Sequence, residues 1–240
     1  MERIVCVALG YVFGLFQTGY LVGKSNGIDI RKVGSKNAGT TNVLRTLGTK
    51  AGLLVFAGDA LKCIFAVLII RLIYGASCAD RMPLLMLYTG AGVILGHNFP
   101  FYLKFKGGKG IAATAGMIIS FSPLFTAFGV ITFFSTFFIT HYVSLGSLLV
   151  YLGFMIELVV LGENGFFHMT RPLLMELYGV GLFLAIMAYA RHWENIKRLL
   201  SHSERKTYLS KKKQEEQKAK MEADTANREQ SAEGELNERS

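Results

Sequence analysis

The sequence predicts an all-α integral membrane protein with about seven transmembrane helices, its N-terminus outside and its C-terminus in the cytoplasm. Hydrophobic residues make up 51% of the 240 residues and charged residues only 18%. The 46 residues from Ile111 to Ile156 contain no Asp, Glu, Lys or Arg. A hydrocarbon layer about 30 Å thick requires roughly 20 apolar residues per helix. This composition excludes an ordinary soluble domain, a disordered chain and a disulfide scaffold.

Seven apolar segments are candidate spans. The first is too long for a secretion signal and lacks a basic start and a small-residue cleavage pattern, so we expect it to be retained. The fourth has 12 residues, which reach only about 18 Å as a helix, and Ser122 and Pro123 end it, so it is either a half-span or a steeply placed helix. The segments are residues 4–23, 51–73, 84–103, 110–121, 123–140, 143–161 and 173–190.

The distribution of Lys and Arg predicts the orientation. Twelve of these residues lie in the loops after the first, third and seventh segments, and four lie near the opposite ends. Short basic loops stay in the cytoplasm. We therefore expect the three basic loops and the C-terminus to face the cytoplasm and the N-terminus to face out.

The chain is expected to divide into a transmembrane domain, residues 1–206, and a charged cytoplasmic tail, residues 207–240. The tail is rich in Lys, Glu, Gln and Ala, a composition that fits a solvated helix or a disordered segment. Cys6, Cys63 and Cys78 form no C-x-x-C pair, so neither a disulfide nor a metal site is expected.

The first basic loop, from Gly34 to Arg45, combines glycines with hydroxyl and amide side chains. Such residues allow backbone N–H groups to converge on an anion, and Arg45 adds a forked, charge-assisted donor. A turn followed by a helix N-cap at Thr41 or Asn42 explains the same residues without a ligand.

The second basic loop contains Lys106, Gly107, Gly108, Lys109 and Gly110 directly before an apolar helix. Free glycine amides at the positive end of a helix are suited to phosphate. The spacing is not that of a nucleotide-binding P-loop, so nucleotide hydrolysis is not indicated. The alternative is a flexible basic loop at the membrane surface.

Two further groups carry possible chemistry. On a helix, His192 and Asn195 share one face with Arg198 beside it, although a juxtamembrane amphipathic stretch would look similar. Asp59 and Lys62 lie three residues apart inside the second segment. Charges within the membrane face the protein interior, where this pair could be functional or purely structural.

Several of these motifs together resemble a known family. The run from Ser35 to Arg45 reads S-x-N-x-G-x-T-N-x-x-R, and Gly96-His97-Asn98-Phe99-Pro100 leads into the second basic loop. Ser144-x-x-Ser147, His192-x-x-Asn195-Ile196-x-Arg198 and the D-x-x-K of Asp59 and Lys62 follow the same pattern. Over residues 1–206 the chain resembles the bacterial acyl-phosphate:glycerol-3-phosphate acyltransferase family, PlsY. It departs from the family's usual residues at Lys36, Ala38, Trp193 and His202-Ser203.

The resemblance implies transfer of a fatty acyl group from acyl phosphate to the 1-hydroxyl of glycerol 3-phosphate, which gives lysophosphatidic acid and phosphate. It implies a multi-pass protein of the bacterial inner membrane with a cytoplasmic active site and with no cofactor, metal or nucleic acid. His192, Asn195 and Ser35 would be catalytic. The residues expected to bind substrate or phosphate are Asn42, Arg45, His97, Asn98, Lys104, Lys106, Gly107, Gly108, Lys109, Gly110 and Ser144.

An acyl phosphate is already an activated acyl donor, so the reaction needs no covalent serine or cysteine. His97 and His192 are the only histidines in the motifs. Since the family resembles a case in which a substrate phosphate takes the proton, we expect His192 and Asn195 to position the substrates, with His97 as general base as the alternative. The absence of an H-x-x-x-x-D motif makes acyl-CoA a less suitable donor. A transporter of an organic phosphate and a nonenzymatic membrane scaffold remain alternatives, and the sequence leaves the oligomeric state open.

Overall fold

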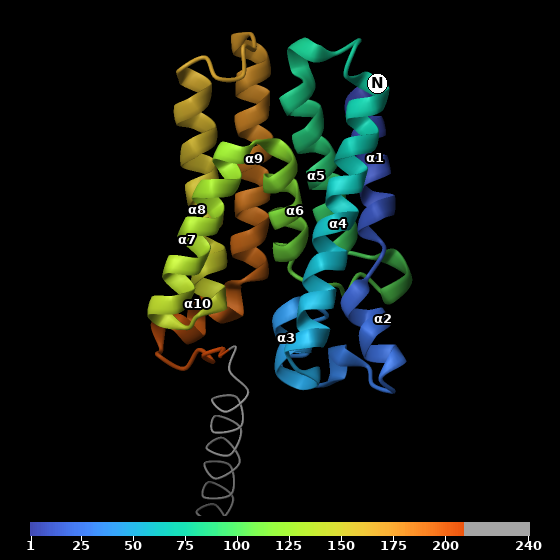
Figure 1. Ribbon diagram of the computed structural model, residues 1–240, viewed down its shortest axis with the longest axis vertical. Coiled ribbons are helices and arrows are strands. Elements are labelled where there is room, and N and C mark those ends of the chain that lie inside the picture. The colour runs from blue at the N-terminus through green and yellow to red at the C-terminus, as the bar shows by residue number, and fades with distance from the viewer. Residues whose placement is uncertain (209–240) are drawn as a thin grey trace, which may run out of the picture. The chain divides into compact units, whose positions relative to one another are not determined.

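A computed structural model describes residues 1–208, of which residues 1–205 form one compact unit (Figure 1). The described residues contain helices and no β-strand. The predicted tail, residues 207–240, lies almost entirely outside the described residues. The helices are α1 (Glu2–Gly14), α2 (Thr18–Ser25), α3 (Thr40–Leu47), α4 (Thr49–Tyr74), α5 (Met82–Asn98), α6 (Ile111–Phe121), α7 (Pro123–Thr140), α8 (Val143–Glu163), α9 (Arg171–Arg191) and α10 (Trp193–Leu200), with short 3-10 turns at Ile30–Lys32, Ala79–Arg81 and Phe101–Leu103.

Six helical stretches among the described residues are long and apolar enough to cross a membrane. They contain six of the seven segments predicted from the sequence, and the seventh is the short helix α6. The all-helical membrane fold is therefore confirmed. The number of crossings and the orientation of the termini stay predictions.

Helices α6 and α7 form a hairpin whose turn lies inside the bundle. Figure 1 shows this turn below the level reached by α4, α5, α8 and α9, because the 11 residues of α6 extend only about 17 Å. Aromatic rings cover the turn: Phe121 lies 5.7 Å from Phe167, and Phe125 lies 6.5 Å from Phe166, measured between ring centroids. Phe166 and Phe167 come from the α8–α9 loop, which thereby caps the hairpin.

Glycines bring α1 and α5 into backbone contact. A Cβ atom on Gly10 would lie 2.2 Å from the Thr89 carbonyl oxygen, and one on Gly96 would lie 2.3 Å from the Tyr11 carbonyl oxygen. Small residues four apart are the usual means by which membrane helices pack this closely. The contact holds the end of α5, with His97 and Asn98, against the first span.

The first predicted span, residues 4–23, is not one continuous helix, because the chain is broken between α1 and α2. A break inside a membrane leaves backbone groups that require partners. The Lys62 ammonium donates to the Phe16 carbonyl at 2.7 Å, and the Gln17 amide donates to the carbonyls of Gly14 and His97 at 3.1 Å each. These polar side chains stabilise the interruption.

Candidate active site

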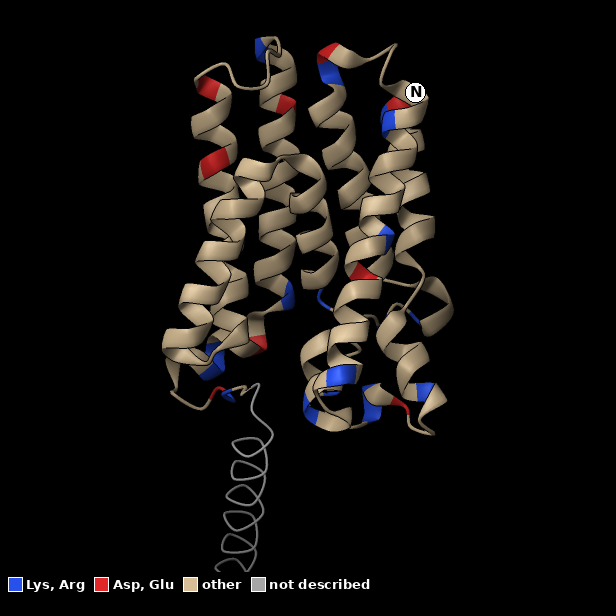
Figure 2. Cartoon of the chain, in the orientation of Figure 1, with Lys and Arg blue, Asp and Glu red and all other residues tan. Residues whose placement is uncertain are grey.

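Lys and Arg gather at the end of the unit where α2, α3 and α10 lie, and the N-terminus lies at the other end (Figure 2). All three predicted basic loops are at the basic end. One of the cations, Lys109, lies among three others and a single carboxylate, that of Glu204. We call this group the cationic cluster; it consists of Arg45, Lys109, Arg191, Arg198 and Glu204.

Glu204 is the hub of the cationic cluster. Its Oε1 accepts hydrogen bonds from Asn195 Nδ2 at 2.7 Å and from Ser144 Oγ at 2.8 Å, and its Oε2 accepts from Arg198 Nε at 2.7 Å. Burial alone would raise the pKa of the Glu204 carboxyl, but these donors hold its pKa below the usual range. Glu204 is therefore ionised, and it links α8 to α10.

The cluster contains more positive than negative charge. Lys109 donates to Asn195 Oδ1, and Arg45 Nη2 donates to the Arg205 carbonyl at 2.8 Å. Burial lowers the pKa of Lys109 to about 8 and that of Arg45 to about 10, despite the attraction of Glu204. Because one carboxylate cannot balance Lys109, Arg191 and Arg198, an arriving phosphate would be stabilised here.

His192 provides a neutral acceptor beside these cations. Burial, followed by repulsion from Lys109, lowers its pKa to about 4. Its Nδ1 lies 2.8 Å from the Ala188 carbonyl oxygen. Since a carbonyl only accepts, we assign the ring proton to Nδ1, which leaves Nε2 free to accept a hydrogen bond from a hydroxyl.

The glycine loop is tied to α5 rather than open on all sides. The Gly107 amide donates to the Asn98 carbonyl at 3.2 Å, and the Gly108 amide donates to the His97 carbonyl at 3.1 Å. These two amides are therefore not the free donors that the sequence suggested. The amides of the first turn of α6, where Gly110 is the N-cap at φ +81°, have no partner within the helix and are suited to an anion.

Arg191 fixes the glycine loop from the other side. Its Nη2 donates to the Gly108 carbonyl at 2.7 Å, and its guanidinium lies 5.3 Å from the centroid of the Phe99 ring. The ends of α5 and α9 therefore meet at this loop. Arg191 was not among the expected site residues, although it directly precedes His192 in the sequence.

A second buried group lies beneath the loop. We call it the inner network; it consists of Thr18, Asp59, Lys62 and His97. Asp59 Oδ1 accepts from Lys62 at 2.8 Å and from Thr18 at 3.0 Å, and His97 Nδ1 lies 2.9 Å from Lys62 Nζ. An ammonium only donates, so we assign the ring proton of His97 to Nε2.

The inner network is buried and supports the glycine loop. Asp59 is 1% exposed and Lys62 5% exposed, which confirms that this pair faces the protein interior. A Cβ atom on Gly108 would lie 2.1 Å from His97 Nε2, so the imidazole packs directly against the loop. His97 therefore serves as a support beneath the loop and is not placed to act as a base.

Asn98 is an unpartnered polar group beside the loop. Both atoms of its side-chain amide are buried without a hydrogen-bond partner. A Cβ atom on Gly110 would lie 3.0 Å from its Oδ1, so the amide faces the start of α6. An unsatisfied buried amide is costly, and its position favours a ligand there.

Asn42 organises the first basic loop. Its Oδ1 accepts from the Ser35 amide at 2.9 Å, and its Nδ2 donates to the carbonyls of Ile30, Val33 and Asn37 at 2.9–3.0 Å. The Asn42 amide is thus engaged with its own loop, and it holds Ser35 and Arg45 in position. Ser35 itself is exposed.

The predicted site residues fall into four groups, of which the first is Ser35 and Asn42 in the first basic loop. Lys109, Ser144, His192, Asn195 and Arg45 come together around Glu204, and His97, Asn98, Gly107, Gly108 and Gly110 form the supporting loop. Lys104 and Lys106 are exposed, and no hydrogen bond or ion pair of their side chains occurs within residues 1–208. The same residues contain no group of three or more His, Cys, Asp or Glu side chains placed to hold a metal ion.

Known sequences match nearly the whole transmembrane part. The glycerol-3-phosphate acyltransferase family model matches residues 4–202. A glycerol-3-phosphate acyltransferase of Alkaliphilus metalliredigens is 39% identical over 211 residues, which cover 86% of this chain and 96% of the relative. The Bacillus subtilis glycerol-3-phosphate acyltransferase is 39% identical over 201 residues, which cover 83% and 95%.

Solved structures match the fold as well. The crystal structure of PlsY (YgiH), an integral membrane glycerol 3-phosphate acyltransferase, in its glycerol 3-phosphate form has a TM-score of 0.74 and 32% identity, covering 87% of this chain and 96% of that one. Its lysophosphatidic acid form has a TM-score of 0.72 and 31% identity, covering 87% and 97%. Sequence and fold agree that this chain belongs to the glycerol-3-phosphate acyltransferase family, as an integral membrane protein.

Proposed function

We propose that this protein transfers a fatty acyl group from acyl phosphate to the 1-hydroxyl of glycerol 3-phosphate, giving lysophosphatidic acid and inorganic phosphate. The observation that carries the proposal is the surplus of half-buried positive charge beside the neutral acceptor His192. Both substrates carry phosphate, and the cationic cluster offers two separate sides to hold them. Family membership and the glycerol 3-phosphate and lysophosphatidic acid forms of PlsY support the acceptor and the product.

The donor phosphate would bind on the side of the glycine loop. Lys109, Arg191 and the amides at the start of α6 are the donors there, and the unpartnered Asn98 amide lies beside them. Glycerol 3-phosphate would bind on the side of α3, where Arg45 and Ser35 stand on the loop shaped by Asn42. The reacting hydroxyl and carbonyl then meet between them, close to Asn195.

Catalysis follows from positioning and charge. The O1 atom of glycerol 3-phosphate attacks the acyl carbonyl, its bond to carbon forms, and the bond from carbon to the phosphate oxygen breaks. His192 Nε2 accepts the hydrogen bond that aims the hydroxyl, and Asn195 with Lys109 stabilises the charge on the carbonyl oxygen. The hydroxyl proton passes to the departing phosphate, so no protein group needs to keep it.

We assign the active site to the cytoplasmic face of a bacterial inner membrane, because all three basic loops gather at one end of the unit. The buried polar side chains also lie almost entirely in that half, from Gln17 to Glu204, with Thr89 as an exception. A transporter would require polar groups along a complete path. The arrangement favours an enzyme over a transporter.

The test is an assay of detergent-purified full-length protein with labelled glycerol 3-phosphate and palmitoyl phosphate, with palmitoyl-CoA in a parallel reaction. We expect lysophosphatidic acid and stoichiometric phosphate only with palmitoyl phosphate. Product only with palmitoyl-CoA would overturn the donor and keep the acyltransferase. No product from folded protein in either reaction would reject the proposal, and phosphate flux in liposomes would then test the transporter.

A further inference from the structure

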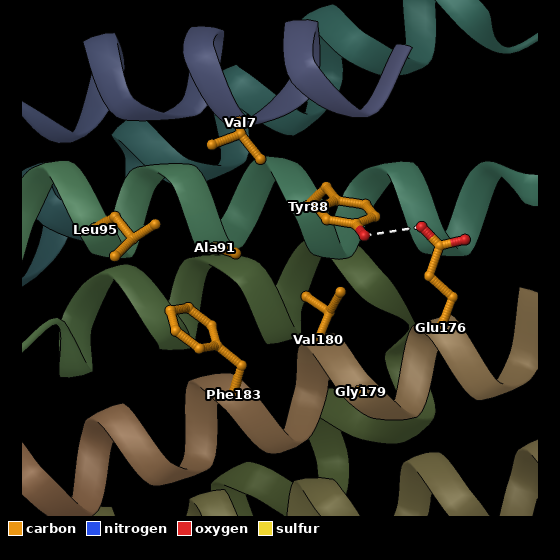
Figure 3. Close-up of a pocket in the computed structure, with 8 residues that line it drawn as sticks. All are labelled: Val7, Tyr88, Ala91, Leu95, Glu176, Gly179, Val180 and Phe183. Atoms are coloured by element: carbon orange, nitrogen blue, oxygen red, sulfur yellow. Dashed lines mark hydrogen bonds between the residues drawn. The ribbon is translucent and has the colours of Figure 1, made fainter. Parts of the chain in front are cut away.

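A groove of about 390 Å³ lies between α1, α5 and α9, away from the cationic cluster. Figure 3 shows its walls: Tyr88, Ala91 and Leu95 come from α5, and Glu176, Gly179, Val180 and Phe183 come from α9, with Val7 of α1 above. The lining is almost entirely apolar, and the volume is that of a small-ligand pocket. No step of the proposed reaction described so far uses it.

Gly179 is open to the groove instead of packing against a helix. A Cβ atom there would meet no atom within 4 Å, whereas one on Gly181, two residues later, would lie 2.7 Å from Leu158. Glycine in a membrane helix usually permits close helix contact. Gly179 permits none, and its effect is to leave space between α9 and α5.

The groove and the active site lie along the same two helices. On α9, Phe183 is followed at four-residue spacing by Met187 and Arg191, and Leu95 of α5 is followed four residues later by Phe99, directly after the helix. Arg191 and Phe99 are in contact, and Arg191 holds the glycine loop. A chain whose reactive end lies at this loop would therefore run along the α5–α9 seam into the groove.

The far end of the groove is polar. Tyr88 donates to Glu176 Oε1 at 2.8 Å, and Arg3 donates to Glu176 Oε2 at 2.7 Å. Glu176 stands 15 residues before Arg191 on α9, which corresponds to about 22 Å along the helix. A methyl end that reached this ion pair would lose apolar contact, so extra length beyond it is unfavourable.

We infer that the α5–α9 groove holds the acyl chain of the donor and that the Tyr88–Glu176–Arg3 cluster sets the preferred chain length. The inference rests on the proposed acyl transfer and adds where the chain lies. A groove that is apolar along its walls, open to the bilayer and directed at the phosphate loop fits a fatty acyl chain better than a polar ligand.

The main test is Gly179→Leu, which fills the groove without meeting a protein atom at its Cβ position. The kcat/KM of the purified variant is measured with lauroyl, palmitoyl and stearoyl phosphate. We expect the palmitoyl-to-lauroyl ratio to fall about tenfold, with the KM for glycerol 3-phosphate unchanged. Tyr88→Ala should act in the opposite sense and raise the stearoyl-to-palmitoyl ratio.

Gly153→Leu is the matched control, because a Cβ atom on this glycine of α8 would meet only a Glu157 oxygen at 3.8 Å and Gly153 is not part of the groove. Its chain-length ratios should equal those of the wild type. Equal losses for all chain lengths in Gly179→Leu, or unchanged ratios in both groove variants, would overturn the inference. Unchanged ratios together with loss of a co-purifying phospholipid would also overturn the inference and would show that a bilayer lipid occupies the groove. Wild-type protein inactive with every acyl phosphate would reject the proposed function itself.

Discussion

The cationic cluster is a half-buried group of charged residues and the inner network is a fully buried one, and both lie beside the Gly107–Gly108 loop. In the inner network, one ammonium meets one carboxylate, and Thr18, His97 and the Phe16 carbonyl add hydrogen bonds, while Asp59 Oδ2 has no partner among the described residues. In the cationic cluster, Lys109, Arg191 and Arg198 lie together with one carboxylate. A balanced group holds the fold together, whereas an unbalanced one has capacity left for an anion. We therefore expect the inner network to support the fold and the cationic cluster to bind substrate.

Lys109→Met should have the largest effect on activity. It removes a cation from the unbalanced group, so we expect kcat/KM to fall by about 10²–10³-fold, as when one transition-state donor is lost. The thermal unfolding midpoint should stay the same or rise, because the remaining cations repel one another less. Lys104→Met, an exposed lysine five residues earlier, is the control and should lose little activity. If Lys109→Met lost stability but kept its turnover, the cationic cluster would be a structural group like the inner network, and the distinction between them would be wrong.

Asp59→Asn should act mainly on stability. It leaves the Lys62 ammonium buried without its carboxylate, which costs about 3–5 kcal/mol. The measurement is thermal unfolding in detergent, and the double variant Asp59→Asn with Lys62→Met should recover much of the loss. If the single variant unfolded at the wild-type temperature and instead lost affinity for glycerol 3-phosphate, the inner network would belong to the binding site.

His192 should make a smaller, pH-dependent contribution. Its pKa of about 4 in the folded protein lies below the ordinary histidine pKa of about 6.5. The unfolded chain therefore takes up the proton first, so the stability from neutral His192 is complete above about pH 6.5 and is lost as the pH falls toward about 4. His192→Asn should show a smaller drop in unfolding temperature between about pH 7 and about pH 5 than the wild type.

The control for the pH measurement is His202→Asn. His202 is exposed, and asparagine tolerates its positive φ of 55°. This variant should keep the wild-type pH dependence. If it and His192→Asn changed the dependence equally, the effect would not come from the buried imidazole.

Much of the fold was predictable because membrane spans are long apolar runs, and one or two polar residues do not remove the hydropathy signal of such a run. The segment before Ser122 and Pro123 was expected to be shorter than an ordinary span, and α6 has only 11 residues. Its length could be predicted because it follows from the residue count. The break after Gly14 was not predictable, because its partners, Lys62 and the α5 carbonyls, are far away in sequence. The apolar pattern of a segment does not indicate hydrogen bonds to residues far away in sequence.

The candidate site was predictable in its residue types and less so in its contacts. His192 and Asn195 were expected to share a face, and they do lie together at the start of α10. The glycine amides were expected to be free, but α5 carbonyls already engage those of Gly107 and Gly108. Glu204 was not expected to belong to the site, because nothing near it in sequence shows that Ser144, Asn195 and Arg198 converge on it.

The interruption between α1 and α2 also affects the order in which the protein can be assembled during synthesis. The Phe16 carbonyl relies on Lys62, and the Gln17 amide relies on Gly96 and His97, none of which yet exist when the first helices leave the ribosome. Lipid provides no substitute partners. We therefore expect the nascent N-terminal segment to enter the bilayer as a continuous helix and to take up its broken form only after α4 and α5 have been inserted.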